Sequence, residues 1–497
     1  MKETVFLDYQ AINFVSFLKL SSTKKFVALS LVISVLIFIV GRLVIPIPNF
    51  YYDSFRYIDW AKNDIIVSIR PTTYSRIISF FKFFSNSDIA LVVAQYACNY
   101  VSNLFLFVTA IYFFPFKKIS KRLLFIVLFL NPLYFITSNI ILSDSFFCAL
   151  AVIWISILIW LIKFPKWYLF AAETLLLIVL FKLRYHGIIF PIILFIALIF
   201  FIKIKVIAKI LVIGINFFLL FLVINDIKNT NQRITGIKIF SAFGGWQMAS
   251  NAMYILQNNS HQVNTNMVIN ADDDTKQILH FVKHYYDTSK NPLKTYLPRG
   301  LFLWEKSSPL NKYLELYAQE NHLSADGAWQ KLGPIYNKFG WYVINKNPVA
   351  YYRYWVLPNF LFYFASSPEA YLYYCNNNDT IPEFVANYYN YKTNVVSIKT
   401  RKLYFLLTSP IRYINSIINI LFIFLTLIYL KTFGINNKNF FTKALLLFAI
   451  IYIINLAFIS ALAPTVLRYH LFIFTLAIPF LIGIIETLTS KFNNKYV

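Results

Sequence analysis

Residues 26–45 read FVALSLVISVLIFIVGRLVI, an apolar run in which Arg42 is the single charged residue. About 20 such residues in an α-helix are long enough to cross the hydrocarbon core of a bilayer. The run therefore predicts a transmembrane helix. It begins well inside the chain and lacks a small-residue cleavage site, so we expect it to remain as an anchor and not to be removed as a signal peptide.

Nine further stretches share this character, and together they predict a polytopic helical membrane protein with about ten transmembrane helices. They lie at 89–114, 121–138, 140–162, 167–183, 187–202, 206–225, 403–430, 441–463 and 468–489. The composition agrees, because 59% of the 497 residues are hydrophobic and 13% are charged, too few polar groups to cover a water-soluble surface. These values exclude a cytosolic enzyme.

The basic residues of the chain are concentrated in some of its predicted loops. The formal net charge of +25 comes from 46 basic and 21 acidic residues, and the basic ones gather in every second loop, as at 117–122 and 203–209. Because cytoplasmic loops carry the excess of Lys and Arg, both termini are predicted to be cytoplasmic. We expect contacts with anionic membrane lipids, no nucleic-acid partner, and a location in the inner membrane of a bacterium.

This topology predicts three parts. An N-terminal transmembrane module, 1–225, includes a first external loop at 46–88 that we expect to carry catalytic residues. The segment 226–402 is long enough for a mainly helical external (periplasmic) subdomain, and 403–497 forms a C-terminal transmembrane module. The aromatic stretch 351–364 is predicted to lie in the membrane interface.

Ionisable side chains at the edge of a bilayer are costly and are therefore functional candidates. Six of them fall at the predicted external face: Asp53, Asp144, Arg184, His186, Arg468 and His470. A site that joins carboxylates to guanidiniums suits a reaction on a phosphate-linked substrate. Such a reaction needs a base and also cations for the leaving phosphate.

These side chains also have structural interpretations. Asp53 could begin a helix and pair locally with Arg56, and Asp144 could cap the fourth helix. The arginines could extend to lipid head groups, and the histidines could simply be packed. Asp59 is expected to be solvated, and the acidic run 272–274 is expected to cap a helix. Binding of a divalent metal ion by carboxylates is left as an open alternative.

Several short motifs follow one another along the chain in a characteristic order. Residues 53–61 read DSFRYIDWA and 69–74 read IRPTTY. They resemble the D/E-x-x-x-Y-x-x-x-A and R-P-P-x-Y stretches in the first external loop of the GT-C superfamily of polytopic glycosyltransferases. Protein O-mannosyltransferases and lipid A aminoarabinose transferases belong to this superfamily. Residues 131–132 (NP) and 142–147 (LSDSFF) are similar to its N-P and E-x-L-F segment, with Asp144 in place of the usual Glu.

The later motifs agree with the same family. Arg184 with Gly187 resembles its R-x-x-G, and Arg468 with Tyr469 resembles its R-Y before the last helix. Several members have an acidic pair at the first-loop carboxylate, whereas Asp53 has no acidic neighbour. The segment 226–402 resembles no motif of the family.

The resemblance implies an inverting transfer of a sugar from a polyprenyl-phosphate-linked donor to a lipid, glycan or protein acceptor outside the membrane, as in cell-envelope glycan biosynthesis. Asp53 would be the general base and Asp144 a supporting or second carboxylate. The donor phosphate would be contacted by Arg184, Arg468, His186 and His470. The site would be shaped by Tyr57, Arg70 and Tyr74. The sugar, the acceptor and any metal requirement are left open.

Two other functions remain as alternatives. An O-antigen-type polysaccharide polymerase or ligase would use a lipid-diphosphate donor, but it concentrates its key Arg and His in a late loop. A lipid or oligosaccharide transporter would need charged groups near the bilayer midplane on several helices, where Glu173 stands nearly alone.

The predicted topology can be tested directly. A cysteine placed at Asp326 should react with an impermeant thiol reagent added to intact cells, because 226–402 is predicted to be external. Labelling that requires permeabilised membranes would contradict this orientation.

Overall fold

The structure is a computed structural model that describes residues 13–258, 270–297, 299–435 and 439–493. Within these ranges the chain is helical and contains no β-strand, as predicted. The first part comprises α1 (Phe14–Lys19), α2 (Ser21–Val44), α3 (Tyr52–Lys62), α4 (Thr73–Phe84), α5 (Ile89–Phe113), α6 (Lys118–Phe129), α7 (Pro132–Ser138), α8 (Asp144–Lys163), α9 (Trp167–Leu183), η2 (Tyr185–Ile189), α10 (Phe190–Phe200) and α11 (Val206–Thr235). The second comprises α12 (Ala242–Leu256), α14 (Asp273–Thr288), α15 (Leu301–Trp304), α16 (Pro309–Glu320), α17 (Ala325–Lys346), α18 (Pro348–Tyr351), η4 (Tyr352–Val356), α19 (Leu357–Phe364), η5 (Glu369–Tyr371), η6 (Tyr374–Asn377), α20 (Glu383–Tyr388), α21 (Ile398–Thr408), α22 (Ile411–Phe433), α23 (Phe440–Leu462), η7 (Leu467–Tyr469) and α24 (Leu471–Asn493).

Eight helical segments in the described ranges are long and apolar enough to cross a membrane, so the chain is a multi-pass membrane protein. They are α2, α5, α6 with α7, α8, α11, α21 with α22, α23 and α24. The other two predicted spans are also helical but shorter: α9 has 17 residues, and η2 continues into α10 over Tyr185–Phe200. A length of 17 residues is at the lower limit for a spanning helix.

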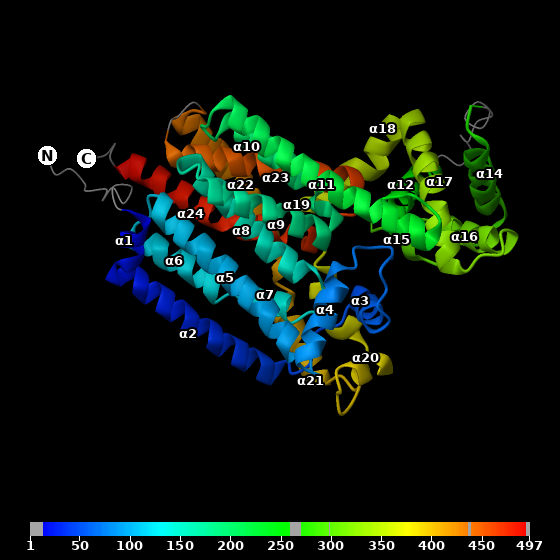
Figure 1. Cartoon of the computed structure of the whole chain (residues 1–497), viewed down its shortest axis with the longest axis horizontal. Coiled ribbons are helices and arrows are strands. Elements are labelled where there is room, and N and C mark those ends of the chain that lie inside the picture. The colour runs from blue at the N-terminus through cyan, green and yellow to red at the C-terminus, as the bar shows by residue number, and fades with distance from the viewer. Residues whose placement is uncertain (1–12, 259–269, 298, 436–438, 494–497) are drawn as a thin grey trace.

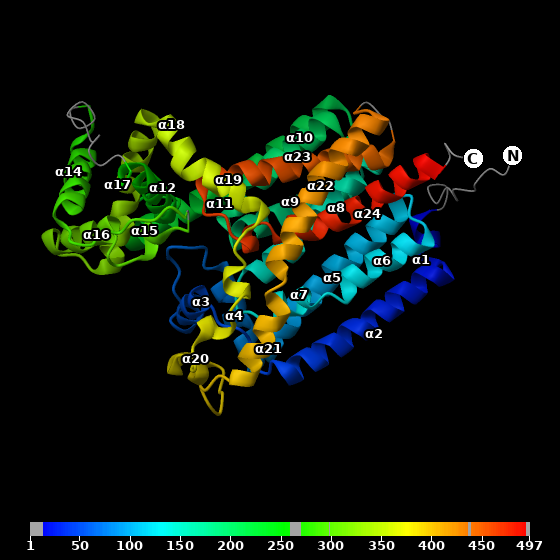
Figure 2. The same ribbon diagram turned by 180° about the vertical axis from the view of Figure 1, so that it is seen from behind.

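The long helices form one bundle with α24 inside and α2 outside (Figures 1 and 2). The apolar window of α24 is 89% buried, against 11% for α2. The start of α2 and the end of α24 lie at one end of the bundle, and α12, α14 and α16 lie beyond the other end (Figure 1). The exposed apolar side chains of α2 therefore form a surface suited to lipid.

A second hydrophobic core lies outside the bundle and includes Trp246, Tyr254, Phe302, Tyr336 and Trp355. It is built from α12, α14 to α18 and η4. The chain then returns to the bundle, because buried side chains from position 363 onward belong to the bundle core. The predicted external segment 226–402 thus contributes to two cores.

One local prediction in this segment is confirmed, the helix cap at the acidic run, whereas the interfacial location of 351–364 stays a prediction. The acidic run starts α14, where the Asp272 side chain accepts a hydrogen bond from the backbone N–H of Thr275. This N-cap satisfies one of the amides that a helix start leaves free. The aromatic stretch 351–364 is helical and contains a π-helical turn, η4; the Trp355 Nε1–H there donates to the Ala461 carbonyl at the end of α23.

Helices α12 and α17 approach closely because glycines face each other. A Cβ added to Gly245 would lie 1.8 Å from the Gly333 carbonyl oxygen, and one added to Gly340 would lie 2.5 Å from the carbonyl carbon of Met248. Only residues without a side chain fit at these positions. The glycines therefore set the spacing of the second core.

Gly245→Ala should destabilise the protein by at least about 1–3 kcal/mol, because the backbones must separate to admit the methyl group. Gly244→Ala is the matched control, since nothing lies within 4 Å of its added Cβ. Thermal unfolding of the full-length protein in detergent would compare them. Equal stability of the two variants would contradict the close contact.

Candidate functional site

Two isolated β-bridges align the loops that carry the charged residues. One pairs Asn49 with Ile140 and the other pairs Ser367 with Val466. Asp53 and Asp144 each follow a bridge partner by four residues, and Glu369 and Arg468 each follow one by two. Each bridge therefore brings together two loops that are distant in the sequence.

The Asn49 side chain fastens the first of these loops. Its Oδ1 accepts from the Cys375 N–H at 2.7 Å, and its Nδ2 donates to the Ala370 carbonyl at 3.0 Å and to the Tyr404 hydroxyl at 2.9 Å. Asn49 is fully buried. A buried amide with these partners is well satisfied, so it fixes the entry to α3 against the loop that contains Glu369.

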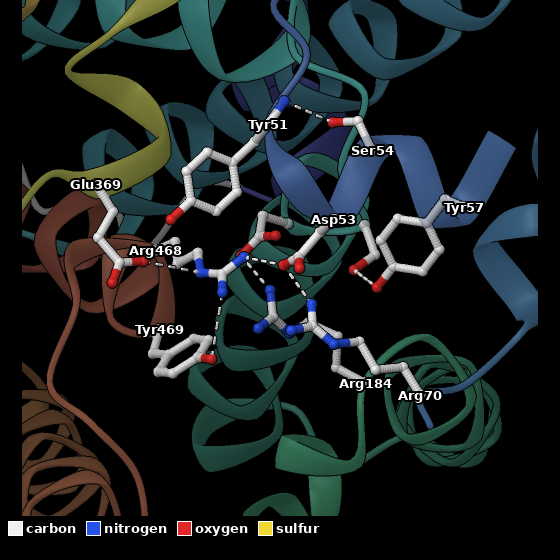
Figure 3. Close-up of polar contacts among 11 residues, drawn as sticks. Tyr51, Asp53, Ser54, Tyr57, Arg70, Arg184, Glu369, Arg468 and Tyr469 are labelled. Atoms are coloured by element: carbon white, nitrogen blue, oxygen red, sulfur yellow. Dashed lines mark hydrogen bonds and ion pairs between the residues drawn. The ribbon is translucent and has the colours of Figure 1, made fainter. Parts of the chain in front are cut away.

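Asp53, in the first turn of α3, lies between two guanidiniums (Figure 3). Its Oδ2 accepts from Arg70 and, at 2.7 Å, from Nη1 of Arg468. Burial alone would raise the pKa of Asp53, but Arg70 and Arg468 outweigh it and hold this pKa well below its usual range. The predicted meeting of Asp53 with Arg468 is present, whereas the local pair with Arg56 is not.

Arg468 contacts carboxylates on two sides. Its Nε lies 3.6 Å from Oε2 of Glu369, and its guanidinium carbon lies 5.2 Å from the centre of the Tyr469 ring and 5.7 Å from that of Tyr51. The Arg468 side chain is only 8% exposed. It is therefore a fixed interior cation of the site and does not extend to lipid head groups.

A second ion pair joins Asp144, at the start of α8, to Arg184. Asp144 is buried and makes no capping hydrogen bond, so the helix-cap interpretation is wrong. The Arg184 guanidinium lies 4.9 Å from the centre of the Tyr469 ring, which Arg468 also faces. Tyr469 thus connects the two ion pairs (Figure 3). We call Asp53, Arg70, Asp144, Arg184, Glu369 and Arg468 the arginine–carboxylate cluster.

The predicted site-shaping residues surround this cluster. The Tyr57 hydroxyl lies 3.3 Å from Oγ of Ser143, next to Asp144 (Figure 3). Arg70 contacts Asp53 directly, and its guanidinium carbon lies 5.7 Å from the centre of the ring of Trp304, an exposed residue at the end of α15. The Tyr74 hydroxyl instead donates to Oε1 of buried Gln95 at 2.6 Å, which fastens α4 to α5.

The two histidines have other polar partners. Nε2 of His186 lies 3.1 Å from Oδ1 of Asn455, and Nε2 of His470 lies 3.0 Å from Oγ of Ser366. The His470 ring also stacks on Tyr363. Their assignment to a donor phosphate stays a prediction.

Sequence reasoning missed Glu369, which lines a cavity of about 560 Å³ beside the cluster. The cavity wall also includes Tyr51, Arg299, Arg412 and Phe405. The available signal was a polar break, Ser366-Ser367-Pro368-Glu369, within an otherwise aromatic stretch. Among the described residues, no group of three or more His, Cys, Asp or Glu side chains is placed to hold a metal ion.

Comparison of the chain with models of known protein families, with curated proteins and with solved structures finds no match.

Asp53→Asn should destabilise the protein by about 3–5 kcal/mol, because two buried guanidiniums would lose their shared counterion. The contribution of Asp53 is complete above the pKa of an ordinary aspartate, about 4, and is lost as the pH falls through its lowered folded-state pKa. Thermal unfolding at neutral pH would measure the loss. Asp59→Asn is the control, because Asp59 is exposed and should change stability little; equal effects of the two substitutions would contradict the ion-pair role.

Proposed function

We propose that this protein is an inverting membrane glycosyltransferase that moves a sugar from a polyprenyl-phosphate-linked donor to a lipid, glycan or protein acceptor on the outer side of the membrane. The observation that carries the proposal is the arginine–carboxylate cluster beside a cavity at one end of the helical bundle. Charged groups persist at such positions for a function more often than for packing. The motif order described above points to the same reaction.

The cavity suits an amphipathic anion. Arg299 and Arg412 line it, and neither forms an ion pair in the described structure. Its apolar lining includes Phe362, Phe405 and Val466. Guanidiniums bind phosphate oxygens in a planar, bidentate way, and apolar walls suit the first isoprene units of a lipid tail.

The surface around the cavity is apolar, which supports entry of the donor from lipid. Leu361 on α19, Leu406 on α21 and Tyr413 on α22 are each at least 60% exposed. Side chains of this kind lower the free energy of a helix surface in hydrocarbon. A donor in the bilayer would therefore reach its site without passing through water.

The chemistry of the transfer requires fixed positive charge near the leaving group. As the bond between the anomeric carbon and the phosphate oxygen breaks, negative charge grows on the phosphate. Arg468 supplies a guanidinium next to Glu369, which lines the cavity. Arg184 adds a second guanidinium, whose carbon lies 4.9 Å from the centre of the same Tyr469 ring that Arg468 faces.

The alternatives fit less well. A polymerase or ligase gathers its key residues in a late loop, whereas Arg468 here pairs with Asp53 of the first loop. For a transporter, the strongest candidate within the bundle is Glu173, which accepts from Trp154 Nε1 at 3.1 Å and lies 3.4 Å from Nδ2 of Asn216. These contacts satisfy the carboxyl locally, as expected of a polar packing contact between helices. We place the active face in the periplasm of a bacterium, with both termini cytoplasmic.

Mass spectrometry of cells with and without the protein tests the transfer. Cells that lack it should miss a single sugar on a surface glycan, lipid or protein and should accumulate the matching polyprenyl-phosphate sugar. Arg468→Lys should reproduce this loss. The guanidinium of Arg468 is planar and contacts both Asp53 and Glu369, whereas the ammonium group of lysine is a compact point charge that cannot contact both. Arg401→Lys is the control, since Arg401 pairs with the largely exposed Asp379.

Two outcomes would contradict the proposal. Identical glycans and lipids in the two strains would exclude the transfer. Loss of a whole glycan without accumulation of a monosaccharide donor would favour transport or polymerisation.

A further inference from the structure

Resting on the proposed function, we propose that Glu369, and not Asp53, takes the proton from the attacking hydroxyl or amine of the acceptor. In this step the acceptor O–H or N–H bond breaks and a bond forms to the anomeric carbon. The anomeric carbon–oxygen bond breaks, and its electron pair leaves with the lipid phosphate. The proton bound by Glu369 passes to water before the next turnover.

The contacts of Asp53 suit a structural anion more than a base. One oxygen accepts from both Arg70 and Arg468, and its charge is offset by two cations at contact distance. It also lies in the first turn of α3, where the helix dipole favours a negative charge. A carboxylate stabilised in this way binds a proton weakly, so its natural role is to orient the two guanidiniums.

Glu369 has the opposite surroundings. Glu369 lines the cavity, its side chain is 23% exposed, and its carboxylate accepts no hydrogen bond in the described structure. Its one ion-pair partner is Arg468, at the long distance of 3.6 Å from the carboxylate. A base must reach the proton that it removes, and Glu369 is the carboxylate of the cluster that faces the cavity.

The backbone holds Glu369 in this position. Its φ of +39° is in a left-handed region that glutamate rarely adopts, and the flanking turn is fixed by the hydrogen bond from the Leu467 N–H to the Ser367 carbonyl. Strained residues of this kind persist only where surrounding structure determines them, and they concentrate at functional sites. The β-bridge that positions Arg468 therefore also positions Glu369.

The electrostatic surroundings support the assignment. Burial raises the pKa of Glu369 above its ordinary value, and the Arg468 guanidinium offsets this only in part. A carboxylate with a raised pKa is a stronger base than an ordinary glutamate. The other charged groups that act on it are Asp53, Asp144 and Arg70. The remaining titratable groups around it or along the cavity are Tyr51, Tyr52, Tyr373, Tyr413, Arg299 and Arg412.

The test combines full-length variants with membranes from cells that lack the protein, which hold both the donor and the unmodified acceptor. Purified protein in detergent is added, and the transferred sugar is followed by mass spectrometry across a pH series. Binding of undecaprenyl phosphate is measured separately as a probe of the donor site. The variants are Glu369→Gln, Glu369→Asp and Asp53→Asn, with Glu383→Gln as an exposed control from the same segment.

We expect Glu369→Gln to slow transfer by roughly 10²–10⁴-fold, the usual contribution of a general base. Binding of undecaprenyl phosphate should stay within about twofold of the wild type, since a base does not hold the phosphate. The wild-type rate should fall as the pH drops through the raised pKa of Glu369, and Glu369→Gln should abolish this acidic limb. Glu369→Asp should restore part of the rate.

The outcomes separate the two proposals. Transfer by Glu369→Gln at the wild-type rate, or with the same acidic limb, would overturn the role of Glu369 while leaving the glycosyltransferase intact. If Asp53→Asn folds stably but transfers no sugar, while Glu369→Gln transfers it at the wild-type rate, then Asp53 is the base. A wild-type protein that transfers no sugar to these membranes would overturn the proposed function itself.

Discussion

The ion pair between Asp53 and Arg468 is the constraint on which the rest of the site depends. The two residues are 415 positions apart, and both are largely buried. A buried charge without a partner costs several kcal/mol, so each residue requires the other. The pair therefore joins the segment between α2 and α5 to the turn before α24, the innermost helix of the bundle. Around this pair lie Arg70, which contacts Asp53, and Glu369 and Tyr469, which contact Arg468.

The helices could be predicted because their signal is local. An apolar run of sufficient length determines a span without reference to other parts of the chain, and an aspartate before a helical pattern determines a cap, as at Asp272. The extent of the second core could not be predicted. Its boundary near position 356 depends on which buried aromatic rings meet, and aromatic residues are abundant on both sides.

The residues of the candidate site could be predicted only in part from the sequence. Sidedness and motif order predict that Asp53, Arg184 and Arg468 lie together, but they do not determine which residues pair. Asp144 pairs with Arg184, and Asp53 is shared by Arg70 and Arg468, pairings that only the β-bridges and loop contacts determine. For Glu369 the only signal was a short polar break in an aromatic stretch, and such a break does not show which distant residues the acidic side chain will meet.

Because the arginine–carboxylate cluster is buried, its ion pairs should depend only weakly on the salt concentration of the medium. Salt weakens interactions between exposed charges over a Debye length of about 8 Å at physiological ionic strength, and it screens buried pairs far less. The side chains of Asp53, Arg70 and Arg468 are between 8% and 16% exposed, whereas Asp379 in the surface pair with Arg401 is 81% exposed. A change in the ionic strength of the medium should therefore alter the surface pair far more than the arrangement of charges in the arginine–carboxylate cluster.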